Sequence, residues 1–327
     1  MKSTKTNFRP KKLRDFLFSL ARVVMPYPLR HFAKHLIHRP RPEVRWLGKA
    51  PKFAPRLLND EVVVTPSGEL FVRGPFETEF RLHLGIATKT VGVGIQEEFL
   101  TFIDIVRRNI KPNDVVLDIG ANVGIYGVTI GKLFPGCHVY CFEPVTETYL
   151  TLQRNIARNK LINTHPIKCA AGEMDGMVQM TTSYGTGNYV VNQHSRQPAL
   201  PTELVEVVKL DSYVRNHHLQ NVSIVKCDVE GYELQVLQGA LETIRECKPI
   251  VMLEVREEWV RRFGEEPGSV FRLLAGLQYE PFAIHTDGKL QRLVDGMRGV
   301  PSKSFNFVFF PHWAVSNQID PGSFESH

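Results

Sequence analysis

The sequence predicts an α/β fold built on a doubly wound, mostly parallel sheet. From residue 97 onward, short apolar runs alternate with longer amphipathic segments, which is the pattern of strands and helices in βαβ units. The first of these strands ends in an acid and a glycine-rich turn, and charged residues gather where a later strand ends. Ligands of such sheets bind at the carboxyl ends of the strands, so these two positions are the first candidates for function.

The elements can be assigned in order along the chain. Residues 60–95 alternate and contain turn signals, which predicts short strands. Beyond them the pattern predicts helices at 97–110, 123–134, 146–160 and 232–246, strands at 114–119, 138–143, 165–172, 222–227 and 249–255, hairpin strands within 175–210 around a polar loop at 192–203, and closing strands within 277–290 and 304–312.

Composition agrees with a soluble globular protein. Of 327 residues, 43% are hydrophobic and 23% are charged, and the length suffices for one large α/β domain with appendages. We expect four parts: a basic amphipathic, helical arm at 1–56, a lead-in of short strands at 57–96, the main domain at 97–315, and a tail at 316–327.

Charge is unevenly distributed. Residues 1–56 contain 15 Lys and Arg against 2 acids, a net +13, whereas the remainder contains 25 against 32, a net −7. Such asymmetry indicates either an anionic partner, namely a membrane surface, a nucleic acid or a charged glycan, or a solvated basic face. Apolar residues at helical spacing in the arm fit an interfacial helix or a helix packed on the body: Leu13, Phe16, Leu17, Leu20 and Val24.

Location is constrained weakly. No stretch reaches the roughly 18 uninterrupted apolar residues of a membrane span, and the N-terminal apolar segment is a poor signal peptide. The 5 cysteines are scattered and form no CxxC, which favours a reducing compartment. We therefore expect a cytoplasmic protein, with association at the inner membrane face left open.

The glycine turn follows the strand at 114–119 and has the form D-x-G-x-N-x-G, from Asp118 through Gly120 and Asn122 to Gly124. A dinucleotide fingerprint has glycine where Asn122 stands, so that pyrophosphate can approach the backbone. The acid two residues before the first glycine disfavours phosphate and favours a cation, such as the amino group or sulfonium of S-adenosylmethionine. Glu143 then ends the next strand, where an acid binds a ribose diol in NAD enzymes and methyltransferases alike.

This turn, the F-E-P around Glu143 and the later K-C-D-V-E-G-Y-E with L-Q-G-A together resemble the FkbM family of S-adenosylmethionine-dependent methyltransferases. The resemblance covers roughly residues 95–256 and leaves out the basic arm. It implies a class I methyltransferase (Rossmann-like) sheet of seven strands with a reversed final hairpin. It also implies methyl transfer to hydroxyl oxygens of sugars and polyketides, with the glycine turn and Glu143 binding the cofactor. It further places Ala171 or Ala170 near the adenine and Glu98 or Glu97 near the methionine end.

Chemistry is expected where the fourth strand ends. If strand alternation continues, Lys226, Asp228 and Glu230 lie on the same side of the strand. Burying three charges there costs free energy unless they lie at the solvent-exposed end of the strand or form ion pairs. Methyl transfer to a hydroxyl requires positioning and a proton acceptor. We expect Glu230 to be the base and Asp228 to orient substrate, cofactor or metal. Lys226 is either part of the catalytic set or an ion-pair partner of Asp228.

A second resemblance concerns a metal. Macrocin-type sugar O-methyltransferases carry an acid-x-acid at this strand end, where the first acid binds a divalent ion and the second is the base. Asp228 and Glu230 match that spacing, and Glu254 at the end of the next strand is a further candidate ligand, although the metal enzymes show two adjacent acids there. Carboxylate ligands would suit Mg²⁺ or Mn²⁺.

The leading interpretation is an O-methyltransferase acting on a hydroxyl of a sugar, a glycan or a small-molecule natural product, with acceptor choice in residues 175–205 and the arm. RNA ribose 2′-O-methylation is a second interpretation; the acidic body and the lack of an aromatic–basic platform argue against it. A non-catalytic membrane-surface or scaffold protein is a third, and the clustered acids argue against that. A nicotinamide oxidoreductase comes last because of Asn122.

Overall fold

The computed structural model describes residues 62–64, 70–81, 97–182, 187–191, 200–294 and 305–318. All of them belong to one of the two units into which the chain divides, Pro55–His327. The expectations for the basic arm at 1–56, and for most of the polar loop and the C-terminal tail, lie outside the described residues.

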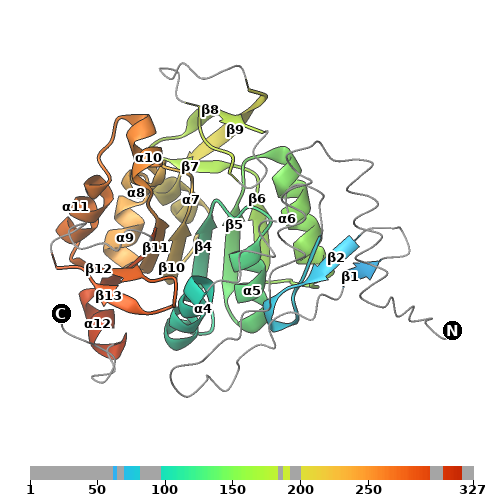
Figure 1. The fold of residues 1–327 in the computed structure, drawn as a ribbon, viewed down its shortest axis with the longest axis horizontal. Coiled ribbons are helices and arrows are strands. Elements are labelled where there is room, and N and C mark those ends of the chain that lie inside the picture. Colours follow the sequence, from blue (N-terminus) through green and yellow to red (C-terminus); the bar gives the residue numbers. More distant parts are fainter. Residues whose placement is uncertain are drawn as a thin grey trace. The chain divides into compact units, whose positions relative to one another are not determined.

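An eight-stranded sheet forms the centre of the described unit (Figure 1). Its order is β13-β12-β14-β11-β10-β4-β5-β6. Five neighbouring strands are parallel, β14 runs antiparallel to both its neighbours, and β13 closes a hairpin with β12. The bounds are β4 Val115–Ile119, β5 His138–Phe142, β6 Thr164–Ile167, β10 Val222–Cys227, β11 Ile250–Glu254, β12 Tyr279–Ile284, β13 Leu290–Arg292 and β14 Asn306–Pro311. The predicted doubly wound, mostly parallel sheet is confirmed. It has eight strands rather than the seven that the resemblance implies, and its reversed strands are β14 and β13.

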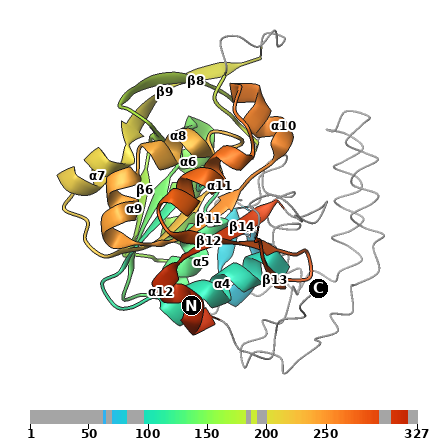
Figure 2. The same cartoon turned by 90° about the vertical axis from the view of Figure 1, so that its left-hand side faces the viewer.

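Helices cover both faces of this sheet (Figures 1 and 2). One face carries α4 Glu97–Asn109, α5 Ile125–Leu133, α6 Thr146–Arg158 and α12 His312–Gln318. The other carries α7 Leu210–Asn216, α8 Glu233–Gln238, α9 Leu241–Cys247 and α11 Gly268–Gly276. Consecutive strand residues serve opposite cores: Val116 packs in the first and Leu117 in the second. A strand buried on both faces explains why its sequence is uniformly apolar.

Two small sheets flank the large one. One contains β7 Ala170–Gly172, β9 Thr202–Lys209 and β8 Gly176–Thr181; the other contains β1 Val62–Val64, β2 Leu70–Arg73 and β3 Glu79–Arg81. The second is fastened to the end of α6, where Asn155 and Asn159 accept backbone hydrogen bonds from β3 at 2.8 and 2.9 Å. Short helical turns complete the described elements: η1 Pro75–Glu77, α10 Glu257–Val260 and η2 Arg261–Phe263.

Two predicted elements are each divided in the structure. The expected strand at 165–172 becomes β6 and β7, because β7 leaves the large sheet and pairs with β9. The expected helix at 232–246 becomes α8 and α9. Gly239 lies against β7 there, since a Cβ on it would be 1.9 Å from the carbonyl oxygen of Gly172. The Asp211 carboxylate then starts the second helix by accepting the backbone N–H groups of Glu242 and Thr243.

Candidate active site

The glycine turn after β4 is forced into a left-handed backbone at three positions. Gly120, Asn122 and Gly124 have φ values of 72°, 56° and 91°. At Gly120 space is also decisive, because a Cβ there would lie 2.0 Å from the carbonyl oxygen of Asp228. The loops that follow β4 and β10 therefore touch backbone to backbone, and glycine is required at their contact.

Glu143 anchors the same turn from the end of β5. One carboxylate oxygen accepts the N–H of Asn122 and the other accepts the N–H of Val145, both at 3.0 Å. Burial raises the pKa of Glu143 to about 7, although these two donors oppose the shift. A carboxylate has about four acceptor sites, so lone pairs remain for a further pair of donors such as a ribose diol.

Asp118 and Lys226 form a buried pair beneath the turn, on adjacent strands. Their carboxylate oxygen and ammonium nitrogen are 3.4 Å apart, and the second oxygen of Asp118 accepts the N–H of Gly127 at 3.0 Å. Lys226 also lies 3.5 Å from Asp228 and donates to the carbonyl oxygen of Gly120 at 3.1 Å. Burial alone would lower the pKa of Lys226, but the two carboxylates outweigh it and raise that pKa.

The acids after β10 do not continue the alternation of the strand. β10 ends at Cys227, and Glu230 has a φ of 59°, in the left-handed region. The expectation that Lys226, Asp228 and Glu230 share one side of a strand is therefore wrong. A turn presents Glu230 instead, and burial, with the charges of Asp228 and Glu233, raises its pKa to about 8.

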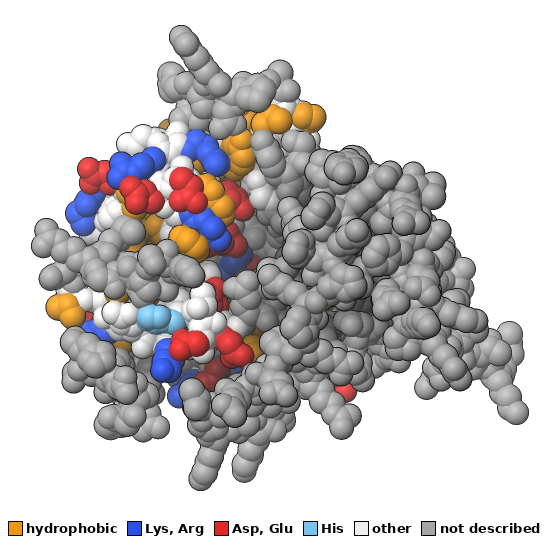
Figure 3. Space-filling view, viewed as in Figure 1, with side chains coloured by type: hydrophobic (Ala, Val, Ile, Leu, Met, Phe, Trp, Pro, Cys, Tyr) orange, Lys and Arg blue, Asp and Glu red, His pale blue; other side chains and the backbone are white. Residues whose placement is uncertain are grey.

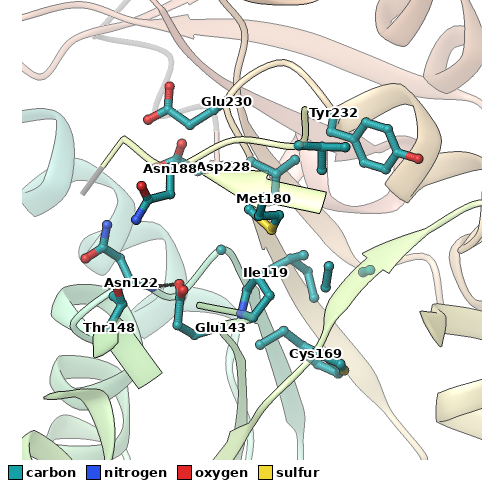
Figure 4. Close-up of a pocket in the computed structure, with 17 residues that line it drawn as sticks. Ile119, Asn122, Glu143, Thr148, Cys169, Met180, Asn188, Asp228, Glu230 and Tyr232 are labelled. Atoms are coloured by element: carbon teal, nitrogen blue, oxygen red, sulfur yellow. Dashed lines mark hydrogen bonds between the residues drawn. The ribbon is translucent and has the colours of Figure 1, made fainter. Parts of the chain in front are cut away.

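A pocket of about 640 Å³, counted with its open mouth, lies over the carboxyl ends of β4, β5 and β10 (Figure 4). Acidic, amide and apolar side chains all contribute to its lining. It is lined by Ile119, Gly120, Asn122, Phe142, Glu143, Pro144, Thr148, Cys169, Ala170, Ala171, Met180, Asn188, Val190, Asp228, Val229, Glu230 and Tyr232.

The pocket brings together six of the predicted site residues, namely Gly120, Asn122, Glu143, Ala171, Asp228 and Glu230, and Ala170, the alternative to Ala171, lines it as well. Five others do not line it. Asp118 and Lys226 are enclosed below the turn, and Gly124 packs so closely on Leu152 that a Cβ would be 2.6 Å from it. Glu98 and Glu254 lie at neighbouring elements. Asn306 donates to Glu98 at 2.8 Å, and Arg256 donates to Glu254 at 2.7 Å.

Sequence reasoning did not single out the wall supplied by the small sheet. Met180 lies near the end of β8, and Val190 pairs with it through an isolated antiparallel bridge. Asn188, two residues before Val190, lines the pocket as well. Figure 4 shows the Asn188 amide between Asn122 and Glu230. The sequence predicts acceptor choice in residues 175–205 as a whole, without distinguishing single residues within that range. Thr148 and Tyr232 were also missed, since nothing in their local sequence marks them.

The described residues do not fit the expected Mg²⁺ or Mn²⁺ site. Among them, no group of three or more His, Cys, Asp or Glu side chains is arranged to hold a metal ion. Glu254 is engaged by the Arg256 guanidinium, which itself stacks on Trp259 and Phe305 with ring-centroid distances of 4.6 and 4.1 Å.

The same residues do fit S-adenosylmethionine. Apolar walls suit an adenine ring, Glu143 suits its ribose diol, and the carboxyl groups of Asp228 and Glu230 suit the positive charge of a sulfonium. A class I methyltransferase sheet with this pocket at its carboxyl edge defines an S-adenosylmethionine-dependent methyltransferase.

Comparison with known proteins gives the family. Residues 118–281 match the sequence model described as the methyltransferase FkbM domain, and the chain belongs to that family.

Three relatives are named as methyltransferases. Methyltransferase sdnD of Sordaria araneosa is 24% identical over 46% of this chain and 69% of the relative. The 2-O-methyltransferase NoeI of Sinorhizobium fredii is 24% identical over 49% and 68%. The hexuronic acid methyltransferase AglP of Haloferax volcanii is 23% identical over 53% and 67%. Across these and two further relatives, the alignments span 59 to 69% of the relative's length.

Proposed function

We propose that this chain transfers a methyl group from S-adenosylmethionine to a hydroxyl oxygen of a sugar, a glycan or a small-molecule natural product. The observation that carries the proposal is that Asp228 and Glu230 line the same pocket as Gly120, Asn122 and Glu143. A cofactor-binding set and a proton-accepting set therefore meet in one space.

The roles follow from the chemistry of each group. S-adenosylmethionine, when bound, supplies an electrophilic methyl group. Glu143 and the glycine turn hold the adenosine part, and Asp228 orients the acceptor hydroxyl or compensates positive charge. Glu230 accepts the proton that leaves the hydroxyl. Its pKa of about 8 suits a group that exchanges protons near neutral pH. Glu230 can accept a proton only when its carboxyl group is ionised. Because its pKa lies above 7, this role requires bound cofactor or acceptor to stabilise the ionised carboxylate.

The acceptor class is supported by the names of relatives and by the chemistry of the wall. One relative is named a 2-O-methyltransferase and another a hexuronic acid methyltransferase. Carboxylate and amide side chains such as Asp228, Glu230 and Asn188 are the partners that several hydroxyl groups of a sugar require.

RNA methylation is less well supported. On the face in Figure 3, described Lys and Arg side chains are intermixed with Asp and Glu, and they form no continuous basic surface there. Binding to a nucleic-acid backbone depends on neutralising several phosphates together.

We also propose that residues 1–56 direct the chain to an anionic membrane surface, which would put methylation at the inner membrane face. The support is the net +13 of the arm against the net −7 of the remainder. Among the described residues, none of the helices combines the length and the apolar character that a membrane span requires.

Calorimetry tests the cofactor part of the proposal. Wild type should bind S-adenosylmethionine and S-adenosylhomocysteine but not NAD⁺, and Glu143→Ala should weaken both. Transfer of a labelled methyl group is then measured to methyl glucoside, glucuronic acid and an RNA oligonucleotide. Labelling of RNA alone would replace the proposed acceptor. Absence of binding by a folded chain would replace catalysis with a scaffold role.

A further inference from the structure

The segment from Asp228 to Gly231 is held in a constrained backbone. Glu230 and Gly231 have φ values of 59° and 104°, both left-handed. Gly231 lies against α10, where a Cβ would be 2.6 Å from the carbonyl oxygen of Trp259. A residue with a side chain, such as Glu230, adopts this region only where the surroundings compensate the strain.

Glu233, the first residue of α8, supplies that compensation. A single carboxylate oxygen accepts the N–H of Val229 at 3.0 Å and the N–H of Gly231 at 3.1 Å. These two amides flank Glu230, so the oxygen bridges the residue whose backbone is left-handed. Hydrogen bonds to a charged acceptor are roughly twice as strong as neutral ones.

Stability alone does not explain a carboxylate at this position. Glu233 is 1% exposed, and its other oxygen has no hydrogen-bond partner among the described residues. Burial raises its pKa to about 7, so the ionised form is costly there. A half-satisfied buried carboxyl group is a poor choice for a helix start unless the two amides that it holds matter.

We propose that Glu233 is a positioning residue: by bridging the amides of Val229 and Gly231, it fixes the segment that presents Glu230 to the pocket beside Asp228. Glu233 does not line the pocket itself. The catalytic consequence rests on the proposed role of Glu230 as the base, whereas the bridge can be tested independently of that role.

The chain offers a matched control in Asp211. It is also buried, at 3% exposed, and accepts two backbone N–H groups, at 3.1 and 2.8 Å, where α9 begins. It is not among the residues that line the pocket. Asp211 also accepts the hydroxyl of Thr243 at 2.8 Å, so Asp211→Ala removes at least as many buried hydrogen bonds as Glu233→Leu, and only the second should affect the site.

The first experiment needs no methyl acceptor. Hydrogen exchange at the amides of Val229 and Gly231 should accelerate in Glu233→Leu beyond any change in global stability. It should be unchanged in Asp211→Ala after the same correction, and largely restored in Glu233→Gln, which keeps one oxygen acceptor. Unaltered protection of both amides in Glu233→Leu would overturn the proposal. Equal acceleration in the Gln variant would also overturn it, because charge rather than the bridge would then be responsible.

The second experiment measures methyl transfer to glucuronic acid. Glu233→Leu should lower kcat about 100-fold, the scale for a displaced catalytic group, with little change in S-adenosylhomocysteine affinity. Asp211→Ala should retain its kcat. If Glu230→Gln keeps wild-type kcat, Glu230 is not the base. The hydrogen-exchange experiment still tests whether Glu233 bridges the two amides. If Glu233→Leu loses no more kcat than Asp211→Ala, its role is structural only.

Discussion

At the scale of single residues, the contact between Gly120 and Asp228 leaves no room for a side chain at position 120. A Cβ at Gly120 would meet a carbonyl oxygen at 2.0 Å, and its φ of 72° disfavours any side chain. We expect Gly120→Ala to lower the free energy of unfolding by about 1–3 kcal/mol and to weaken S-adenosylhomocysteine binding at least about tenfold. Urea titration and calorimetry measure the two effects.

Gly176 provides the comparison for that substitution. It begins β8 with no atom within 4 Å of a Cβ built on it, so Gly176→Ala should leave both quantities unchanged. Equal behaviour of the two variants would show that the close approach of the two loops does not govern binding.

Glu143 should make cofactor binding depend on pH. Ribose hydroxyls donate to the ionised carboxylate, and the pKa of Glu143 is about 7 in the folded chain. Binding therefore releases a proton at low pH, and the affinity for S-adenosylhomocysteine should fall as pH decreases through 7, approaching about tenfold per pH unit. Calorimetry between pH 5.5 and 8.5 in buffers of different ionisation enthalpy measures this slope.

The same shift acts on folding in the opposite sense. A carboxyl group whose pKa is higher in the folded than in the unfolded chain contributes stability below its unfolded pKa, near 4.5, and loses it as pH rises through about 7. Glu143→Gln should remove both dependences. If the variant keeps the wild-type binding slope, another group controls the cofactor's pH dependence.

Residue types near the turn were predictable because they follow from local chemistry. A tight turn could be predicted from the spacing of Gly120, Asn122 and Gly124. A hydrogen-bond acceptor at the end of the next strand could be predicted from the acid at Glu143. The depth of Asp118 and Lys226 was not predictable. Alternation gives the side of a strand but not whether a loop covers it, and here the glycine turn lies above both.

At the scale of elements, Lys226 joins β4, β10 and the glycine turn. Its ammonium group lies 3.4 Å from Asp118 and 3.5 Å from Asp228. Lys226→Met leaves the Asp118 carboxylate buried without a counter-charge, which should cost about 3–5 kcal/mol of unfolding free energy. The double variant with Asp118→Asn should cost less than the sum of the single variants, because the neutral amide carries no charge that the loss of Lys226 could leave unpaired. Urea unfolding of the four proteins gives this coupling, and additive losses would contradict it.

The strands and helices that were predicted well are those whose apolar periodicity is uninterrupted, such as α4 at Glu97–Asn109 and β11 at Ile250–Glu254. The failures have a tertiary cause. β7 separates from β6 because it pairs with β9, more than thirty residues further along, and Gly239 breaks a helix because β7 passes beside it. The pocket wall formed by Met180 and Val190 depends on the pairing of β8 with β9 and on an isolated bridge, so no local pattern predicts it.

At the scale of the whole molecule, charge is separated between residues 1–56 and the remainder, and this separation bears on the proposed binding to an anionic membrane. A basic residue near an anionic bilayer contributes about 1 kcal/mol, and the contribution is screened by salt. A net +13 carried by one segment would attract such a surface while a body at net −7 is repelled from it.

Charge reversal in the full chain tests this separation. Lys11→Glu, Lys12→Glu and Arg14→Glu together should abolish most flotation with vesicles of phosphatidylcholine and phosphatidylglycerol, and wild-type flotation should decrease with added salt. The matched control reverses three exposed lysines of the body, Lys111, Lys132 and Lys160, and should float as wild type does. If both triple variants float equally, total charge rather than the arm drives association. If wild type does not float at all, the arm does not bind an anionic bilayer, and the methyl acceptor need not be attached to a membrane.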